Sequence, residues 1–132
     1  MRAIIADTGP LYAAIDVDDQ YHQRSKTQIQ RINAEKLTIL LSFPVYLETY
    51  NLLLYRLGTK QAISFAKDCI ESVYFINPSQ DQYIAATEKA AHFPDQKITL
   101  CDAVTAILSE EMKFPVWTYD YHFDVMQVQI WR

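Results

Sequence analysis

Four acidic residues spread over most of the chain are placed where solubility alone does not explain them: Asp7, Glu48, Asp102 and Asp120. Asp7 directly follows the apolar run AIIA, and Asp120 comes shortly after VWT, so both follow segments typical of buried strands. An ionised carboxylate beside a core is costly unless a cation or hydrogen bonds compensate it. Each of these acids therefore needs either a local backbone contact or a bound metal ion.

Local structure offers an explanation for several of these acids. Asp7, together with Thr8, could cap a short helix. Asp102 completes the sequence TLCD, which matches the capping-box pattern, and its carboxylate could hold the helix start with one oxygen while projecting the other into a cleft. Asp120 could form an Asx turn. Asp124 is either a fifth acid at the same place or a solvated loop residue.

Glu48 is the acid with the weakest structural explanation. It lies in the segment PVYLETYNLLLYRL, which is apolar almost all round and carries a stripe at helical spacing formed by Val45, Leu52 and Tyr55. This pattern predicts a largely buried helix, in which a glutamate needs a cation or a hydrogen-bond partner.

The elements that would position these acids alternate between strands and helices. Apolar runs rich in branched side chains, and one alternating run at the end, predict strands over residues 2–6, 37–41, 72–76, 115–118 and 126–131. Helical patterns separate them. The alternation predicts a single α/β domain over residues 1–132, with a mostly parallel central sheet flanked by helices. Ligands bind beyond the carboxyl ends of such strands, and the four acids map to that rim.

Carboxylates that gather without cationic side chains raise one another's pKa values unless divalent cations lie between them. An all-oxygen ligand set selects hard ions, Mg²⁺ or Mn²⁺, which commonly bridge protein carboxylates and substrate phosphates. The residues therefore predict metal-dependent hydrolysis of a phosphodiester.

Composition excludes several other classes. Gly9 and Gly58 are the only glycines among 132 residues, which excludes a P-loop and a GxGxxG dinucleotide turn. Cys69 and Cys101 lack CxxC spacing and are expected to be small buried hydrophobes. The net charge of −4 argues against non-specific coating of nucleic acid but allows a nuclease whose acids hold metal. Neither a membrane span nor a secretory signal is recognisable, so we expect a cytoplasmic protein.

Five motifs, in this order along the chain, resemble those of the PIN-domain ribonucleases, and among them the VapC-type toxins of bacterial toxin-antitoxin pairs: IIADTGPLYAAID, DDQYHQR, PVYLETYNLL, TLCDAVTA and VWTYDYHFD. The resemblance implies a PIN-like nuclease domain over the whole chain. It implies that the four acids hold Mg²⁺ (or Mn²⁺) for in-line attack of water on an RNA phosphate. Thr8 and Thr118 would support this site through their hydroxyl groups.

One position departs from the family pattern. The residue two after Asp120, often acidic in relatives, is His122 here, which puts an additional acidic ligand in doubt; Asp124 would be its replacement. Outside the acids, a basic run that includes Arg24, Lys26 and Arg31 could guide RNA to the site, with His22 as a phosphate contact. The favoured explanation for each of these four side chains taken alone is a solvated helix face.

The resemblance also implies partners. It implies a homodimer and a cognate antitoxin whose C-terminal segment lies across the active-site groove and inserts a basic side chain among the acids. Independently, we expect four aromatic side chains to exceed what a small core can bury and therefore to form part of an interface: Tyr46, Tyr50, Tyr55 and Phe65.

Three alternatives remain. The letters DTG at residues 7–9 are also the aspartic-protease signature, but that fold is nearly all β whereas this chain alternates strand and helix. A phosphoacceptor receiver domain needs an aspartate after its third strand, where this chain has Glu48 within a helix instead. A PIN-fold module that is catalytically silent and only binds RNA or a protein would require a damaged set of acids, and the set is intact.

Overall fold

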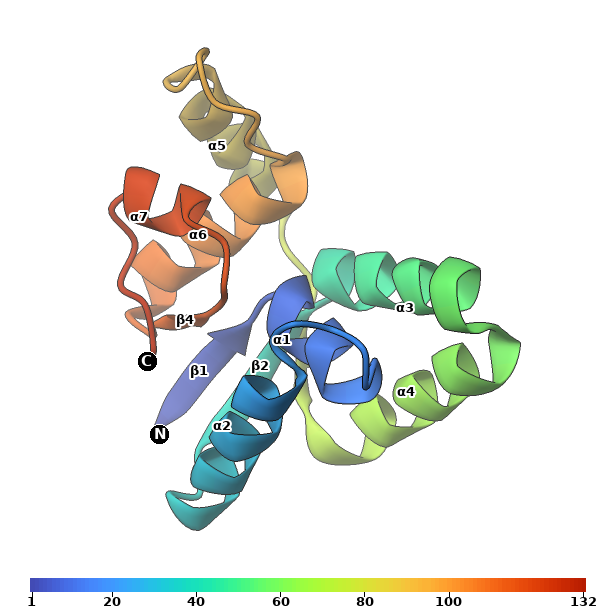
Figure 1. Ribbon diagram of the computed structural model, residues 1–132. Coiled ribbons are helices and arrows are strands. Elements are labelled where there is room, and N and C mark those ends of the chain that lie inside the picture. The colour runs from blue at the N-terminus through green and yellow to red at the C-terminus, as the bar shows by residue number, and fades with distance from the viewer.

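A four-stranded parallel sheet forms the centre of the molecule in the computed structural model, which describes residues 1–132 (Figure 1). The strands are β1 (Ala3–Ala6), β2 (Thr38–Ser42), β3 (Tyr74–Ile76) and β4 (Val116–Trp117). Their order in the sheet is β3-β2-β1-β4, and all three pairings are parallel. The predicted α/β class and parallel sheet are confirmed.

Helices form every connection between consecutive strands (Figure 1). In chain order they are α1 (Thr8–Ile15), α2 (His22–Ala34), α3 (Phe43–Leu57), α4 (Thr59–Ser72), α5 (Gln80–Ala91), α6 (Leu100–Met112) and the short α7 (His122–Val125). The helices α3 and α4 pack against each other, as do α5 and α6. None of the helices combines the length and the apolar composition that crossing a bilayer requires.

The sheet buries both of its faces. Ile4 and Ala6 of β1 belong to the largest core cluster, which includes side chains of α1 to α4. Ala3 and Ile5 point to the other face, where they pack with Leu108 of α6. Because successive side chains of a strand alternate between faces, a strand covered on both sides must be apolar throughout. This explains why the first strand reads as a continuous apolar run.

The strand order reverses at β1. The chain moves outward from β1 to β2 to β3 and then returns to place β4 on the opposite side of β1. Such a reversal opens a crevice at the carboxyl ends of the adjacent strands β1 and β4, because the chain connections on the two sides of this point run in opposite directions. Asp7 lies at this point, and its backbone N–H donates to the carbonyl oxygen of Trp117 at 3.0 Å. The sheet therefore delivers Asp7 and the chain after β4 to the same crevice.

The predicted strand over residues 126–131 was wrong. Only Ile130 makes an isolated bridge, to Val116. Gln127 adopts a left-handed conformation (φ 59°), and the turn around it buries both Met126 and Val128 in one small cluster. The alternation of apolar and polar residues here comes from a turn that follows α7, which the period-two pattern does not distinguish from a strand.

The prediction that α3 is largely buried was also wrong. Val45 is fully buried and Leu52 half-buried, but Tyr55 is 85% exposed, and Leu47 and Glu48 lie on the exposed side of the helix. The apolar residues on that side have no covering element within this chain. An apolar helix surface without a covering element is typical of a protein-protein interface.

Of the four aromatic residues that were expected not to fit into the core, three pack in it or against it. Phe65 is buried, while Tyr46 and Tyr50 are half-buried and pack against the main cluster. Tyr46 contacts Phe65 and Phe75 with ring centroids 6.0 and 5.1 Å apart. Only Tyr55 is left on the surface, so this part of the interface argument was wrong.

Candidate active site

The four predicted acids line a single cavity of about 390 Å³ at the crevice. They come from four separate elements: Asp7 follows β1, Glu48 lies in α3, Asp102 lies in the first turn of α6, and Asp120 lies in the loop after β4. The charge of each of the other three raises the pKa of Asp102. Four carboxylates spread over 113 positions of the sequence are thus close enough for their charges to interact.

Asp7 occupies the N-cap position of α1 but does not act as a side-chain cap. No backbone N–H of the helix donates to its carboxylate in cap geometry. Its Oδ2 instead accepts a hydrogen bond from the Thr118 hydroxyl at 2.7 Å. The side chain is 4% exposed. Burial, with the charges of Glu48 and Asp120, raises the pKa of Asp7 to about 6 despite the Thr118 hydrogen bond. The capping explanation for this carboxylate is therefore not needed.

Asp102 holds the start of α6 with its backbone, which leaves its carboxylate for the cavity. The Asp102 N–H donates to Thr99 Oγ1 at 3.0 Å, and Thr99 is the N-cap residue. The residue is 7% exposed. Burial, followed by the charges of Asp7, Asp120 and Glu48, raises the pKa of Asp102 to about 7. A carboxylate with such a pKa strongly favours a nearby cation.

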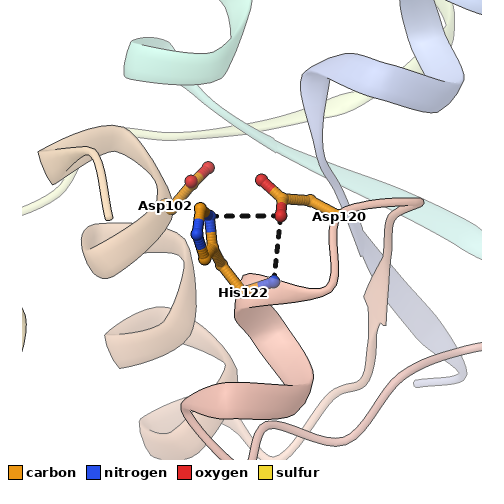
Figure 2. Close-up of side chains that lie close together, drawn as sticks. All are labelled: Asp102, Asp120 and His122. Atoms are coloured by element: carbon orange, nitrogen blue, oxygen red, sulfur yellow. Dashed lines mark hydrogen bonds and ion pairs between the residues drawn. The ribbon is translucent and has the colours of Figure 1, made fainter. Parts of the chain in front are cut away.

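Asp120 forms the Asx turn that the sequence suggested, and it also faces Asp102 (Figure 2). Its Oδ1 accepts from the His122 N–H at 2.9 Å, and its own N–H donates to Thr118 Oγ1 at 3.0 Å. Thr118 therefore contacts both Asp7 and Asp120 through one hydroxyl. The expected supporting position of Thr118 agrees with these contacts.

Glu48 reaches the cavity from the exposed side of α3. Its neighbour across the cavity wall is Cys101, which is half-buried rather than fully buried as predicted. Burial and the Glu48 carboxylate raise the pKa of the Cys101 thiol well above its usual value. The thiol therefore stays neutral, and a neutral thiol is neither a good nucleophile nor a metal ligand. The hydroxyl of Thr8, another predicted supporting residue, accepts from Thr49 at 3.3 Å.

Several cavity residues were missed by the sequence analysis. Arg56, in the last turn of α3, is the only Lys or Arg that lines the cavity, and its guanidinium lies 5.3 Å above the Tyr12 ring. Tyr21 and Tyr119 form an aromatic pair in the cavity wall, with ring centroids 4.7 Å apart. The spacing of Arg56 two turns after Glu48 on one helix was the available signal.

The loop that carries Asp120 is fixed by Gln28 of α2. Gln28 Oε1 accepts hydrogen bonds from Trp117 Nε1 at 2.8 Å and from the Tyr119 hydroxyl. Trp117 is fully buried, so this bond satisfies a donor that water does not reach. The helix α2 therefore sets the position of the chain that enters the site.

Of the four predicted substrate-binding residues, one lies near the site, and the other three line neither the acidic cavity nor its neighbour. Arg24 lies near the site, with its guanidinium 4.7 Å from the centre of the Tyr119 ring. Lys26 is exposed and lines no cavity next to the acids. Arg31 is held away from the site by Glu35 and by Trp131, whose ring centre is 4.5 Å away. His22 Nδ1 lies 2.7 Å from the carbonyl oxygen of Ala13, which ties α2 to α1.

Asp124 does not join the acids. Its side chain is exposed, and its Oδ1 lies 3.4 Å from the Arg132 guanidinium. Asp124 instead lines a second cavity of about 290 Å³. Thr118, Tyr119 and Asp120 form the wall of this cavity that is close to the acidic cavity. The remaining lining residues of this second cavity are Arg24, Tyr121, Ile130 and Arg132.

The donor set fits a divalent cation. The four predicted acids face one cavity, whose lining also includes Asp19. Asp7 and Asp102 are buried with raised pKa values, and a single arginine in the lining offers compensating charge. Oxygen ligands of this kind suit Mg²⁺ or Mn²⁺. The residues that could hold the ion are Asp7, Glu48, Asp102 and Asp120.

Comparisons with known proteins identify the family and the fold of this chain. The PIN domain family model matches residues 4–128. The crystal structure of VapC20 from Mycobacterium tuberculosis, a toxin that cleaves the sarcin-ricin loop, is similar with a TM-score of 0.84 and 21% identity over 96% of both chains. No curated protein sequence gives a significant match.

Two structures of toxin-antitoxin complexes share the fold as well. VapBC2 from Rickettsia felis, bound to a DNA fragment from its promoter, gives a TM-score of 0.74 at 15% identity over 97% of this chain and 96% of that one. FitAcB from Neisseria gonorrhoeae gives 0.70 at 14% identity, over 98% and 96%. Since the family model covers nearly the whole sequence, this chain belongs to the PIN domain family.

Proposed function

We propose that this protein is a metal-dependent endoribonuclease that hydrolyses RNA phosphodiester bonds, and that it is the toxin of a toxin-antitoxin pair. The observation that carries the proposal is the convergence of four carboxylates, two of them buried, in one cavity at the reversal of strand order. The resemblance to VapC20, itself described as cleaving the sarcin-ricin loop, supports the choice of RNA as substrate.

In this proposal Asp7, Glu48, Asp102 and Asp120 bind Mg²⁺ or Mn²⁺. When bound, the cation lowers the pKa of a coordinated water and neutralises charge on the phosphate. Thr118 orients two of these carboxylates, because its hydroxyl donates to Asp7 and accepts from the Asp120 N–H. Arg56, the cation on the far side of the cavity, is placed to attract the phosphate of the substrate.

The second cavity supplies a place for the RNA strand beside the cleaved bond. Arg24 has no carboxylate within ion-pair distance, so its charge is available to a phosphate. Stacking on Tyr119 fixes its guanidinium at the wall between the two cavities. Bases of an unpaired strand can stack on exposed aromatic rings, which Tyr121 provides next to this wall.

Replacing Arg24 by alanine should therefore weaken RNA binding more than the chemical step. We expect KM for an RNA substrate to rise by about 10- to 150-fold, the equivalent of one lost charged hydrogen bond, with kcat changed much less. The measurement is steady-state cleavage of a fluorescent RNA. Lys67→Ala, an exposed lysine on α4, is the matched control and should change neither constant. Equal effects of the two substitutions would contradict a role for Arg24 in binding.

An antitoxin and a second copy of this chain are the proposed partners. The groove beside Glu48 is apolar, with a volume of about 420 Å³, and its lining includes Phe43, Leu47, Tyr83 and Leu100. These side chains are exposed in the single chain. Complexes of the VapBC and FitAcB type support an antitoxin as one occupant of the surface around the active site.

Cleavage of RNA by the purified protein tests the proposal. The protein, free of any co-purified partner, is incubated with total cellular RNA in Mg²⁺, in Mn²⁺ and in EDTA. We expect discrete fragments with either metal and none with EDTA, and sequencing of the fragment ends identifies the target. If the folded protein binds RNA or an antitoxin but cleaves nothing under any condition, the catalytically silent binding module replaces this proposal.

A further inference from the structure

His122 brings a nitrogen atom close to Asp102 and Asp120, two of the acids that line the acidic cavity. The histidine begins α7, two residues after Asp120, and its side chain is 13% exposed. Ligand atoms of Asp102, Asp120 and His122 all lie within 4.8 Å of one another (Figure 2). The group thus combines one acid from α6, one from the loop after β4, and an imidazole from α7.

The Nδ1 atom of His122 is buried and has no hydrogen-bond partner. Asp120 Oδ1 is only 3.2 Å away, but the geometry is not that of a hydrogen bond, and this oxygen already accepts the His122 N–H. A buried polar atom without a partner is costly, and native structures seldom leave one unexplained. A metal ion supplies the missing partner, because the lone pair of a neutral imidazole nitrogen is a metal ligand.

The 3.2 Å separation has a simple meaning in coordination geometry. Two ligands at adjacent corners of an octahedron, each about 2.1 Å from the ion, are about 3 Å apart. His122 Nδ1 and the Asp120 carboxylate are therefore spaced as neighbouring ligands of one ion. In Figure 2 the second Asp120 oxygen is turned toward Asp102, so the space for the ion is bounded by all three side chains.

The other two histidines are bound in a different way. His22 Nδ1 lies 2.7 Å from the carbonyl oxygen of Ala13, and His92 Nδ1 lies 2.7 Å from that of Glu88. Both rings are thus fixed by backbone acceptors, and neither belongs to the group of close ligand atoms that includes Asp102 and Asp120. His122 alone among the three has its Nδ1 directed at carboxylates.

We propose that His122 Nδ1 is a ligand of the metal ion, together with Asp102 and Asp120, and that this nitrogen makes the centre prefer Mn²⁺ to Mg²⁺. The inference rests on the proposed metal-dependent function and specifies its ion. Imidazole nitrogen suits transition metals, whereas Mg²⁺ takes oxygen ligands and retains its water. An all-carboxylate site at the same place would not discriminate in this way.

Pulsed electron paramagnetic resonance of the full chain loaded with Mn²⁺ tests the ligand directly. We expect a ¹⁴N coupling in the native protein that changes to a ¹⁵N coupling when histidine is isotopically labelled, a result that needs no substitution. His122→Ala should remove the coupling and lower Mn²⁺ affinity by about 10- to 100-fold with a much smaller effect on Mg²⁺. His92→Ala is the matched control and should preserve both the coupling and the affinity.

The outcomes separate the ligand from the function. If Mn²⁺ binds but shows no nitrogen coupling, the role of His122 is overturned, while a metal site made of oxygen ligands and the proposed nuclease remain. If neither Mn²⁺ nor Mg²⁺ binds to the native protein in calorimetry, the ligand and the metal-dependent nuclease both fall. His122→Asp provides a further check, because an oxygen ligand at this position should reduce the preference for Mn²⁺.

Discussion

Asp7→Asn should abolish RNA cleavage and yet stabilise the metal-free protein. The substitution removes a negative charge from the acidic cavity but keeps the size of the side chain. Asparagine Oδ1 can still accept the hydrogen bond that Thr118 donates to Asp7. We expect kcat/KM to fall by more than about 100-fold, the upper range for the loss of even an outer-sphere partner of a metal site.

The expected gain in stability has a separate cause. The Asp7 carboxylate is 4% exposed, and burial raises its pKa to about 6, so its ionised form is unfavourable in the folded state near neutral pH. A neutral amide avoids that cost. Thermal unfolding in EDTA at pH 8 should therefore show a higher Tm for Asp7→Asn than for the native chain.

Asp95→Asn is the matched control for both measurements. This aspartate is exposed in the loop before α6 and lines neither the acidic cavity nor the second cavity. Its substitution should leave cleavage and Tm nearly unchanged. Cleavage by Asp7→Asn at the native rate would place the reaction elsewhere in the protein or in a contaminant, and a large loss of Tm would show that the Asp7 charge is needed for folding.

Stability of the metal-free protein should decrease as the pH rises from 5 to 8. Burial and the neighbouring acids raise the pKa of Asp7 to about 6 and that of Asp102 to about 7, above the value of 3.8 for a free aspartate. Between about pH 4 and 7 the folded state therefore holds more protons than the unfolded state, and its free energy of unfolding falls with increasing pH. The total loss is on the order of a few kcal/mol, reduced by the coupling between the two acids.

Divalent cations should reverse this dependence. They bind the deprotonated carboxylates, so the stabilisation by Mn²⁺ or Mg²⁺ should be small at pH 5 and exceed about 5 °C in Tm at pH 8 with saturating ion. The measurement is thermal unfolding across this pH range with EDTA and with each metal. Asp16 and Glu35 act in the opposite sense, because their pKa values are lowered in the folded state, and their contribution to the pH dependence lies mainly at lower pH.

Two results would contradict these predictions of pH dependence. A metal effect independent of pH would mean that the ion binds outside the acidic cavity. A Tm in EDTA that rises toward pH 8 would show that Asp7 and Asp102 ionise as ordinary surface acids. In Asp7→Asn the decrease in Tm between pH 5 and 8 should be smaller than in the native protein, since only Asp102 still contributes.

The sequence predicted the fold and the meeting of the acids because both follow from local patterns combined with one rule of topology. An apolar run followed by Asp7 predicts a strand end, and the carboxyl ends of parallel strands share a rim. The capping sequence TLCD likewise placed Asp102 in the first turn of α6, where the structure has it. These predictions needed no knowledge of how distant side chains pack.

The features that the sequence analysis missed depend on how elements distant in the sequence pack together. The burial of α3 was overestimated because an apolar helix surface gives the same pattern whether this chain or a partner covers it. Arg56 was overlooked because its place in the cavity depends on the direction of α3 across the crevice. The role of His122 was left open since only the three-dimensional structure shows that its Nδ1 has no partner.

The shortness of β4 has a consequence for the timing of folding. The hydrogen bond between Thr118 and Asp7 joins residues 111 positions apart, and β4 contributes only Val116 and Trp117 to the sheet. Contacts of such long range form late, because the entropy of closing the loop is lost before they provide stabilisation. During synthesis from the N-terminus, Asp7 and Glu48 therefore leave the ribosome well before Asp120. The proposed nuclease site of the nascent chain, beside the RNA of the ribosome, therefore remains incomplete until β4 has emerged and paired with β1.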